Sequence, residues 1–93
     1  MKLYKIEQNV VTDWDTYSDA VVCAVDEADA KSIHPCTDGQ VPTPNDKGDF
    51  VLPDEEYVWR DWAENVKDVV ATYLGEADDR VPRGVVVASY HAG

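Results

Sequence analysis

Two adjoining segments decide the fold: Ala20-Val21-Val22-Cys23-Ala24-Val25 and Asp26-Glu27-Ala28-Asp29-Ala30-Lys31-Ser32-Ile33-His34. The first is continuously apolar, rich in β-branched residues and without a helical period, which is typical of a strand covered on both faces. In the second, Asp26 is a favourable helix N-cap, and acidic residues follow where the first turn of a helix prefers negative charge. Proline follows His34, and the residue before a proline is disfavoured in the α region. The two segments therefore predict a strand over 20–25 and a helix over 26–34.

Three further strands are predicted outside this unit. Residues 2–8 alternate apolar and polar side chains, and two apolar runs rich in β-branched residues occupy 69–74 and 85–90. The segment between these runs, 75–84, is polar and contains a proline, which favours a hairpin connection. The order β-β-α-loop-β-β predicts an α+β fold, in which one principal helix covers one face of a four-stranded, mostly antiparallel sheet.

The remaining segments lack a clear period. Residues 9–19 are rich in Asp and Thr and are predicted to form a polar loop. Proline and glycine interrupt residues 35–56 too often for a regular element, so this stretch is predicted to be an irregular loop. Trp59 and Trp62 lie three residues apart within 57–65, which predicts a short helical turn that packs both rings inward.

Length and charge bound the class of protein. The 93 residues are too few for a second core, so residues 1–93 are predicted to form a single domain. Nineteen acidic residues oppose eight basic ones, which gives a formal net charge of -11. Nucleic acid and anionic membrane surfaces are therefore not expected as partners, because both are bound through Lys and Arg. Such a field attracts a partner with a basic surface, although the same charge also serves solubility alone.

The sequence also bears on the compartment. The N-terminal residues lack the apolar region of a signal peptide, and no segment reaches the roughly 18 apolar residues of a membrane helix. The two cysteines, Cys23 and Cys36, are too few for a disulfide framework. These features predict a cytoplasmic protein.

Two parts of the chain share a layout with other small proteins. The first comprises Thr12-Asp13-Trp14-Asp15-Thr16-Tyr17-Ser18-Asp19-Ala20-Val21-Val22 and then residues 27–35; the second comprises residues 73–77 and 84–93. The shared layout is "YDTYDSAVV", a helix ending in "HP", a "GEA" and a terminal "ASxxAG". With these motifs the chain resembles a family of small uncharacterised proteins of bacteriophages and prophages.

This resemblance covers both ends of the chain and leaves residues 36–54 unmatched. Trp14 departs from the layout, which has a tyrosine or a similar aromatic residue at that place. The resemblance implies a phage or prophage gene product that acts inside a bacterial host cell. It carries over no catalytic residue.

Three aspartates in the first loop raise the question of a cation site. Asp13, Asp15 and Asp19 lack the glycine and glutamate spacing of a calcium-binding loop. Aspartates in loops also stabilise turns by bonding to their own backbone, which is the simpler interpretation. No metal or cofactor is therefore predicted.

The sequence contains no pattern typical of a zinc site or of a nucleophile. Cys23, His34, Cys36 and His91 lack the paired spacing of a structural zinc site, and His34 is interpreted as a residue at the negative end of a helix. Ser89 and His91 lie two residues apart on a strand, about 6.5 Å from each other, which is beyond hydrogen-bond reach. The chain is therefore predicted not to be an enzyme.

The distribution of acidic residues gives the leading hypothesis. Seven acidic residues and no basic one lie between Lys5 and Lys31. If the first loop and the start of the helix lie close together, one face carries a dense field of carboxylates with aromatic residues among them. The residues of this candidate protein-binding face are Asp13, Trp14, Asp15, Tyr17, Asp19, Glu27 and Asp29. In the simpler alternative, the acids are solvated and the aromatic rings turn into the core.

Three functions remain open at this stage. The first is a non-enzymatic accessory protein that binds a basic protein, such as a host factor, through this face, in one version by mimicking a nucleic-acid backbone. The second is a structural homodimer formed through the sheet edges or the sheet face opposite the helix. The third is a small metal-binding protein or enzyme.

Overall fold

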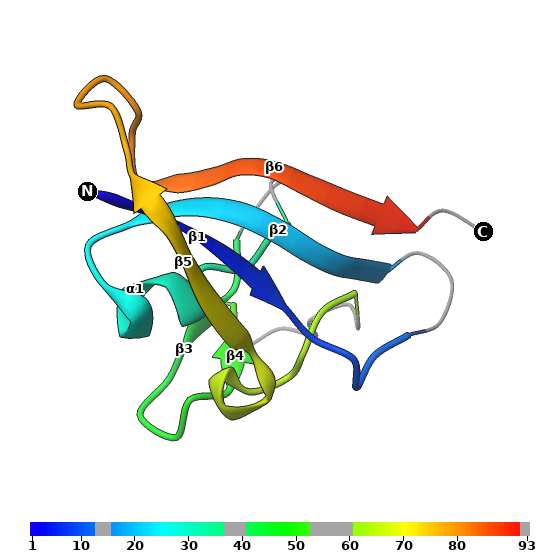
Figure 1. Cartoon of the computed structure of the whole chain (residues 1–93). Coiled ribbons are helices and arrows are strands. Elements are labelled where there is room, and N and C mark those ends of the chain that lie inside the picture. Colours follow the sequence, from blue (N-terminus) through cyan, green and yellow to red (C-terminus); the bar gives the residue numbers. More distant parts are fainter. Residues whose placement is uncertain (13–15, 37–40, 53–60, 92–93) are drawn as a thin grey trace.

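The computed structural model describes residues 1–12, 16–36, 41–52 and 61–91, and for residues 90 and 91 it describes the backbone only. Four strands form one antiparallel sheet, and one short helix lies against one of its faces (Figure 1). The predicted α+β fold with a four-stranded sheet is confirmed. Its elements are β1 (Lys2–Glu7), β2 (Thr16–Ala24), α1 (Glu27–Lys31), β5 (Val70–Glu76) and β6 (Gly84–His91).

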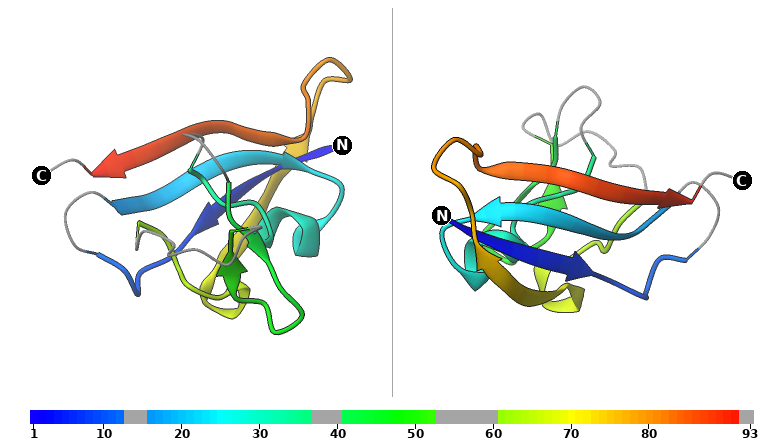
Figure 2. Two further views of the ribbon diagram at one scale, coloured as in Figure 1. Left: turned by 180° about the vertical axis from the view of Figure 1, so that it is seen from behind. Right: turned by 45° about the horizontal axis from the view of Figure 1, so that its top comes forward.

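The strand order is β5-β1-β2-β6, so the two last strands lie at opposite edges of the sheet (Figure 2). The predicted hairpin between them is therefore wrong, because β1 and β2 pair with each other and occupy the centre. The connection between β5 and β6 crosses the end of the sheet beside the N-terminus (Figure 1). There the Ala77 amide donates to the Met1 carbonyl at 3.0 Å, and the Cys23 thiol donates to the Val81 carbonyl at 3.7 Å.

Strand β2 begins earlier than its composition predicts. It includes Thr16 to Asp19, a polar segment that was expected to belong to the first loop. Pairing explains the difference, since Asp19 lies opposite Glu7 of β1 and opposite Ser89 of β6. Neighbours on both sides complete the backbone hydrogen bonds of a segment that has little strand propensity of its own.

The helix is shorter than predicted. The Asp26 side chain accepts from the Asp29 amide at 2.8 Å, which confirms the expected N-cap. The helix ends at Lys31, because the next residue, Ser32, closes a turn onto the Asp29 carbonyl through both its amide and its hydroxyl. His34 therefore lies beyond the helix, buried, rather than at its C-terminal end.

The stretch predicted as an irregular loop contains a small second sheet. Strands β3 (Thr43–Pro44) and β4 (Phe50–Val51) pair with each other across a turn. Gly48 occupies that turn with a φ of 83°, where a side chain would also press within 2.9 Å of Val66. The prediction of irregular structure across 35–56 is thus wrong at this hairpin.

Much of the predicted tryptophan-containing turn at 57–65 lies outside the residues that the structure describes. Trp59 is not among the described residues, and Trp62 is buried in a segment that is not helical. The helical turn of this region comes later, as the 3₁₀ turn η1 (Val66–Asp68), whose N-cap Asn65 accepts from the Lys67 amide. None of the helices among the described residues has the length and apolar character needed to cross a lipid bilayer.

The core lies between the inner face of the sheet and the layer formed by α1, the small sheet and the segment around Trp62. Alternate residues of β1 and β2 point inward, and the helix adds Ala30. The core consists of Tyr4, Ile6, Ala20, Val22, Ala24, Ala30, Ile33, Phe50, Trp62, Ala63 and Val69.

We call the opposite side of the sheet the outer face. Within the described residues, no helix or strand covers it (Figures 1 and 2). The strand register places Val70, Glu7, Asp19 and Ser89 in one row across this face and Thr72, Lys5, Val21 and Val87 in the next. Polar and apolar side chains are therefore mixed on it, and Val70 and Val87 are each more than half exposed.

Candidate functional site

The structure describes four of the seven residues of the predicted acidic face. Asp13, Trp14 and Asp15 lie outside the described residues. Tyr17, on β2, is half-buried and packs against the core. The other three, Asp19, Glu27 and Asp29, belong to β2 and α1.

These three carboxylates do not form one cluster. Asp19 points to the outer face, whereas Glu27 and Asp29 belong to α1, which packs against the inner face. Each lies near a basic side chain of the same protein: Asp19 is 4.0 Å from Lys5, and Glu27 is 3.6 Å from Lys31. Pairs as exposed as these contribute at most about 1 kcal/mol, so they leave the carboxylates available to other cations.

Asp29 forms a stronger contact with Arg83, the residue just before β6. The guanidinium donates through Nε and Nη2 to the Asp29 carboxylate, with the shortest bond at 2.7 Å. The hydrogen bond from Arg83 is the largest influence on the Asp29 carboxyl and lowers its pKa. Because 54 residues separate the partners, no local pattern of residues signals this pair, which ties the helix to the segment that enters β6.

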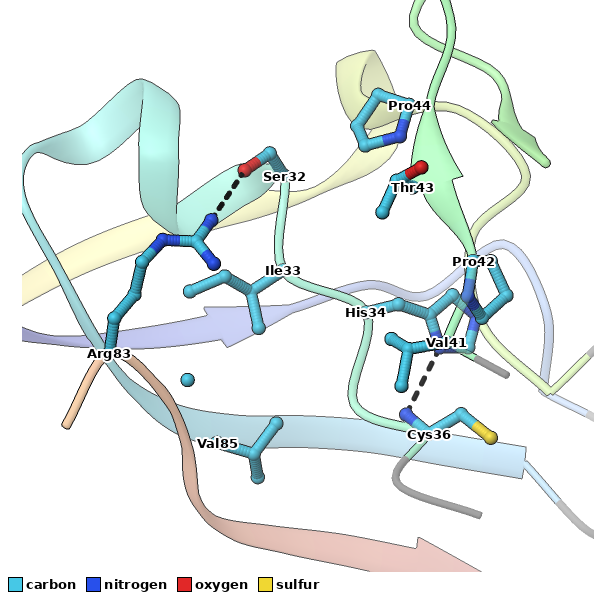
Figure 3. Close-up of a pocket in the computed structure, with 11 residues that line it drawn as sticks. Ser32, Ile33, His34, Cys36, Val41, Pro42, Thr43, Pro44, Arg83 and Val85 are labelled. Atoms are coloured by element: carbon cyan, nitrogen blue, oxygen red, sulfur yellow. Dashed lines mark hydrogen bonds between the residues drawn. The ribbon is translucent and has the colours of Figure 1, made fainter. Parts of the chain in front are cut away.

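A cavity of about 390 Å³ adjoins this pair (Figure 3). It lies between the chain that follows α1, strand β3 and the start of β6. Its wall is mostly apolar, and it includes Ile33, Val41, Pro42, Pro44 and Val85. The volume is at the lower end of the roughly 300–1,000 Å³ of ligand pockets.

His34 is buried at the edge of this cavity. Its Nδ1 accepts from the Cys36 amide at 3.0 Å, which places the proton of the neutral ring on Nε2. Nε2 lies 3.5 Å from Asp61 Oδ1, and the ring meets Phe50 edge-on. Burial lowers the His34 pKa to about 4 and raises the pKa of Asp61.

This arrangement does not present a base to the cavity. The lone pair of the neutral imidazole is used by the Cys36 amide, and the Nε2 proton faces Asp61. In the described part of the chain, no three His, Cys, Asp or Glu side chains are grouped so that they would hold a metal ion. Ser89 is exposed on β6, and the side chain of His91 lies outside the description.

The low pKa of His34 predicts a loss of stability in mild acid. Between the ordinary value of 6.5 and about 4, the unfolded chain binds a proton that the folded chain does not. The free energy of unfolding is therefore expected to fall by about 3 kcal/mol across this window, as urea titrations at successive pH values would measure. The raised pKa of Asp61 acts in the opposite sense, because there the folded chain takes up the proton first.

The control for this prediction is a pair of histidine variants. His34→Asn keeps an acceptor for the Cys36 amide but does not titrate, so its stability is expected to lose the dependence that His34 contributes. His91→Asn is expected to keep the full dependence. An unchanged pH slope in His34→Asn would assign the acid sensitivity to other groups.

The comparisons with known proteins add no relative. The chain matches no protein-family model, and neither the curated proteins nor the solved structures contain a significant match.

Proposed function

We propose that this chain is a non-enzymatic accessory protein, of phage or prophage type, that binds a protein with a basic surface in the cytoplasm of a bacterial host. The observation that carries the proposal is the surplus of carboxylates. If every Lys and Arg paired with one acidic residue, 19 minus 8, or eleven, carboxylates would remain. Among the acidic residues that the structure describes, only Asp61 is buried.

The outer face of the sheet offers this charge a platform. Glu7 and Asp19 flank Lys5 there, and the side chains of the two acids are 45% and 39% exposed. Beside them a hollow of about 370 Å³ is lined by Asp19, Val21 and Val87. A basic side chain of the partner could take the place of Lys5 beside Asp19. It would also contact the apolar surface of Val21 and Val87, so the charge of Asp19 and the burial of apolar surface would both favour binding.

The electrostatic part of this proposal predicts that binding depends on Asp13, Asp15 and Asp19. Replacing all three by Asn removes three negative charges, so a basic partner is expected to associate more slowly and to be recovered in smaller amounts. The measurement is quantitative mass spectrometry of proteins captured from bacterial lysate, at low and at moderate salt. The mimicry version further expects the partner to be a protein that binds nucleic acid.

A second triple variant separates local from global charge. Asp46, Asp68 and Asp79 lie outside the predicted face, and their replacement by Asn changes the net charge by the same amount. We expect this control to retain the partner at moderate salt. Equal capture by the wild type and both variants would remove the proposal that the carboxylates recognise a partner.

A second candidate is a structural homodimer, and the uncovered outer face favours it. Val70, Leu74 and Val87 are each more than half exposed there or at its edges. Burial of apolar side chains contributes about 25 cal/mol per Å² removed from water, which a dimer would gain. We expect light scattering at micromolar concentration to give the mass of a dimer if this candidate is right, and of a monomer if the acidic surface serves another protein.

A further inference from the structure

The edge strand β6 has an uncharged sequence. It runs from Gly84 to His91 without an Asp, Glu, Lys or Arg, in a protein with nineteen acidic residues. Within the described residues it pairs with β2 alone, so its other edge has backbone groups free of strand partners. Edge strands are usually protected from pairing by Lys, Pro or inward charges, and β6 contains none of these. Its pairing with β2 does have two register shifts, one between Tyr17 and Asp19 and one between Val21 and Val22.

The cavity beside α1 adjoins the start of this strand. Gly84 and Val85 of β6 line it, together with Val41 and Pro42 just before β3. Figure 3 shows Val85, Val41 and Pro42 among the lining residues. In a strand that paired with β6, alternate side chains would point toward the inner side of the sheet, where the cavity lies. Backbone pairing along an edge combined with a pocket for one side chain is a recurring mode of peptide recognition.

We propose that β6 and this cavity bind an extended basic segment of a partner protein, which adds a strand beside β6 and places an apolar side chain in the cavity. The inference rests on the proposed function and adds a second contact, at the β6 edge beside the outer face. The uncharged edge allows close approach without like charges opposite each other, and the net charge of -11 favours basic residues on the incoming strand.

Arg83 does not oppose a basic segment at the cavity. Its guanidinium lies at the cavity but is bound to Asp29 and lies 3.4 Å from the Ser32 hydroxyl. Because its charge is neutralised locally, it neither attracts a carboxylate strongly nor repels a lysine. A second copy of this chain fits the edge less well, since it would bring another eleven negative charges.

The test selects peptides from a displayed random library, each about as long as β6, on the immobilised wild-type protein. We expect enriched peptides to alternate basic and apolar residues, and one synthetic example to bind with a saturable anisotropy signal. In an added strand, the backbone amides of alternate residues donate to β6. We therefore expect binding to be lost when N-methyl groups replace the hydrogens of those amides, and to be kept when the other alternate residues are N-methylated.

Matched protein variants place the peptide on the protein. Val41→Trp fills the cavity from an exposed position, and it is expected to weaken the peptide about tenfold or more because the apolar anchor is excluded. Val70→Trp adds the same bulk on the opposite edge strand and is expected to bind normally. Circular dichroism of both variants verifies that the fold is kept.

Several results would overturn the inference. These are an absence of enriched peptides, equal binding of the N-methylated peptide in both alternating registers, or equal binding by Val41→Trp. A wild-type dimer that Val41→Trp converts to a monomer would also overturn it, because a second copy would then occupy β6. If peptides fail while lysate capture still depends on Asp13, Asp15 and Asp19, the proposed function stands and only this location is wrong.

Discussion

Replacing Trp62 by alanine is expected to lower the free energy of unfolding by about 3–5 kcal/mol. Trp62 is the largest fully buried side chain among the described residues, and it belongs to the core that joins the sheet to the second layer. Domains of this kind have a total stability of about 5–15 kcal/mol, so the variant is expected to be close to unfolding at 25 °C. Urea titration followed by far-ultraviolet circular dichroism measures the change without relying on tryptophan emission.

The control is Trp62→Phe. The indole nitrogen of Trp62 is buried and has no hydrogen-bond partner among the described residues. Phenylalanine removes this unsatisfied donor while keeping an aromatic ring, so its loss of stability is expected to be much smaller than that of alanine. Similar losses in both variants would mean that ring packing is not the source of the effect.

Replacing Gln8 by alanine is expected to cost about 3 kcal/mol, although the residue is polar. Its amide nitrogen donates to the carbonyls of Val11 and Tyr17, each at 2.8 Å. Its amide oxygen accepts from the amides of Val10 and Val11. Truncation would remove these four hydrogen bonds next to the buried Val11, and the loss of a bond to a buried group costs about 1–3 kcal/mol.

Gln8→Glu tests the same hydrogen bonds by replacing the donor of the side chain with a second acceptor. The carboxylate keeps the acceptor for the two amides but places a negative oxygen against the two carbonyls. We therefore expect a loss at neutral pH that diminishes, relative to wild type, as acid protonates the new carboxyl group. Wild-type stability of Gln8→Ala would show that these bonds are not needed to close the chain between β1 and β2.

The local elements of the fold were predictable because their signals are local. The apolar run at 20–25 and the cap at Asp26 predicted a strand and a helix start that the structure confirms. The order of the strands could not be predicted, because the composition of the run 85–90 does not indicate whether it pairs with β5 or with β2. The early start of β2 also depends on partners that are distant in sequence, as the pairing of Asp19 with Ser89 illustrates.

The candidate sites depend even more on contacts between residues that are distant in sequence. The acidic run from Glu7 to Asp29 is continuous in sequence, yet a strand and a helix separate its members onto two sides of the sheet. The Asp29–Arg83 pair and the cavity beside it combine three distant segments, so no local pattern signals them. The role of Gln8 was missed for a different reason, since its place at the end of the predicted strand 2–8 does not indicate the backbone groups that its amide bonds.

The strand order has a consequence for how the chain folds. Both central strands come from the first 24 residues, whereas both outer strands come from the last 24. During synthesis, the N-terminal pair emerges first and has two unprotected flanks until the final residues of β6 are made. Closing such long loops before any contact is gained slows folding, so a chaperone that shields the early pair is expected to raise the yield of native protein.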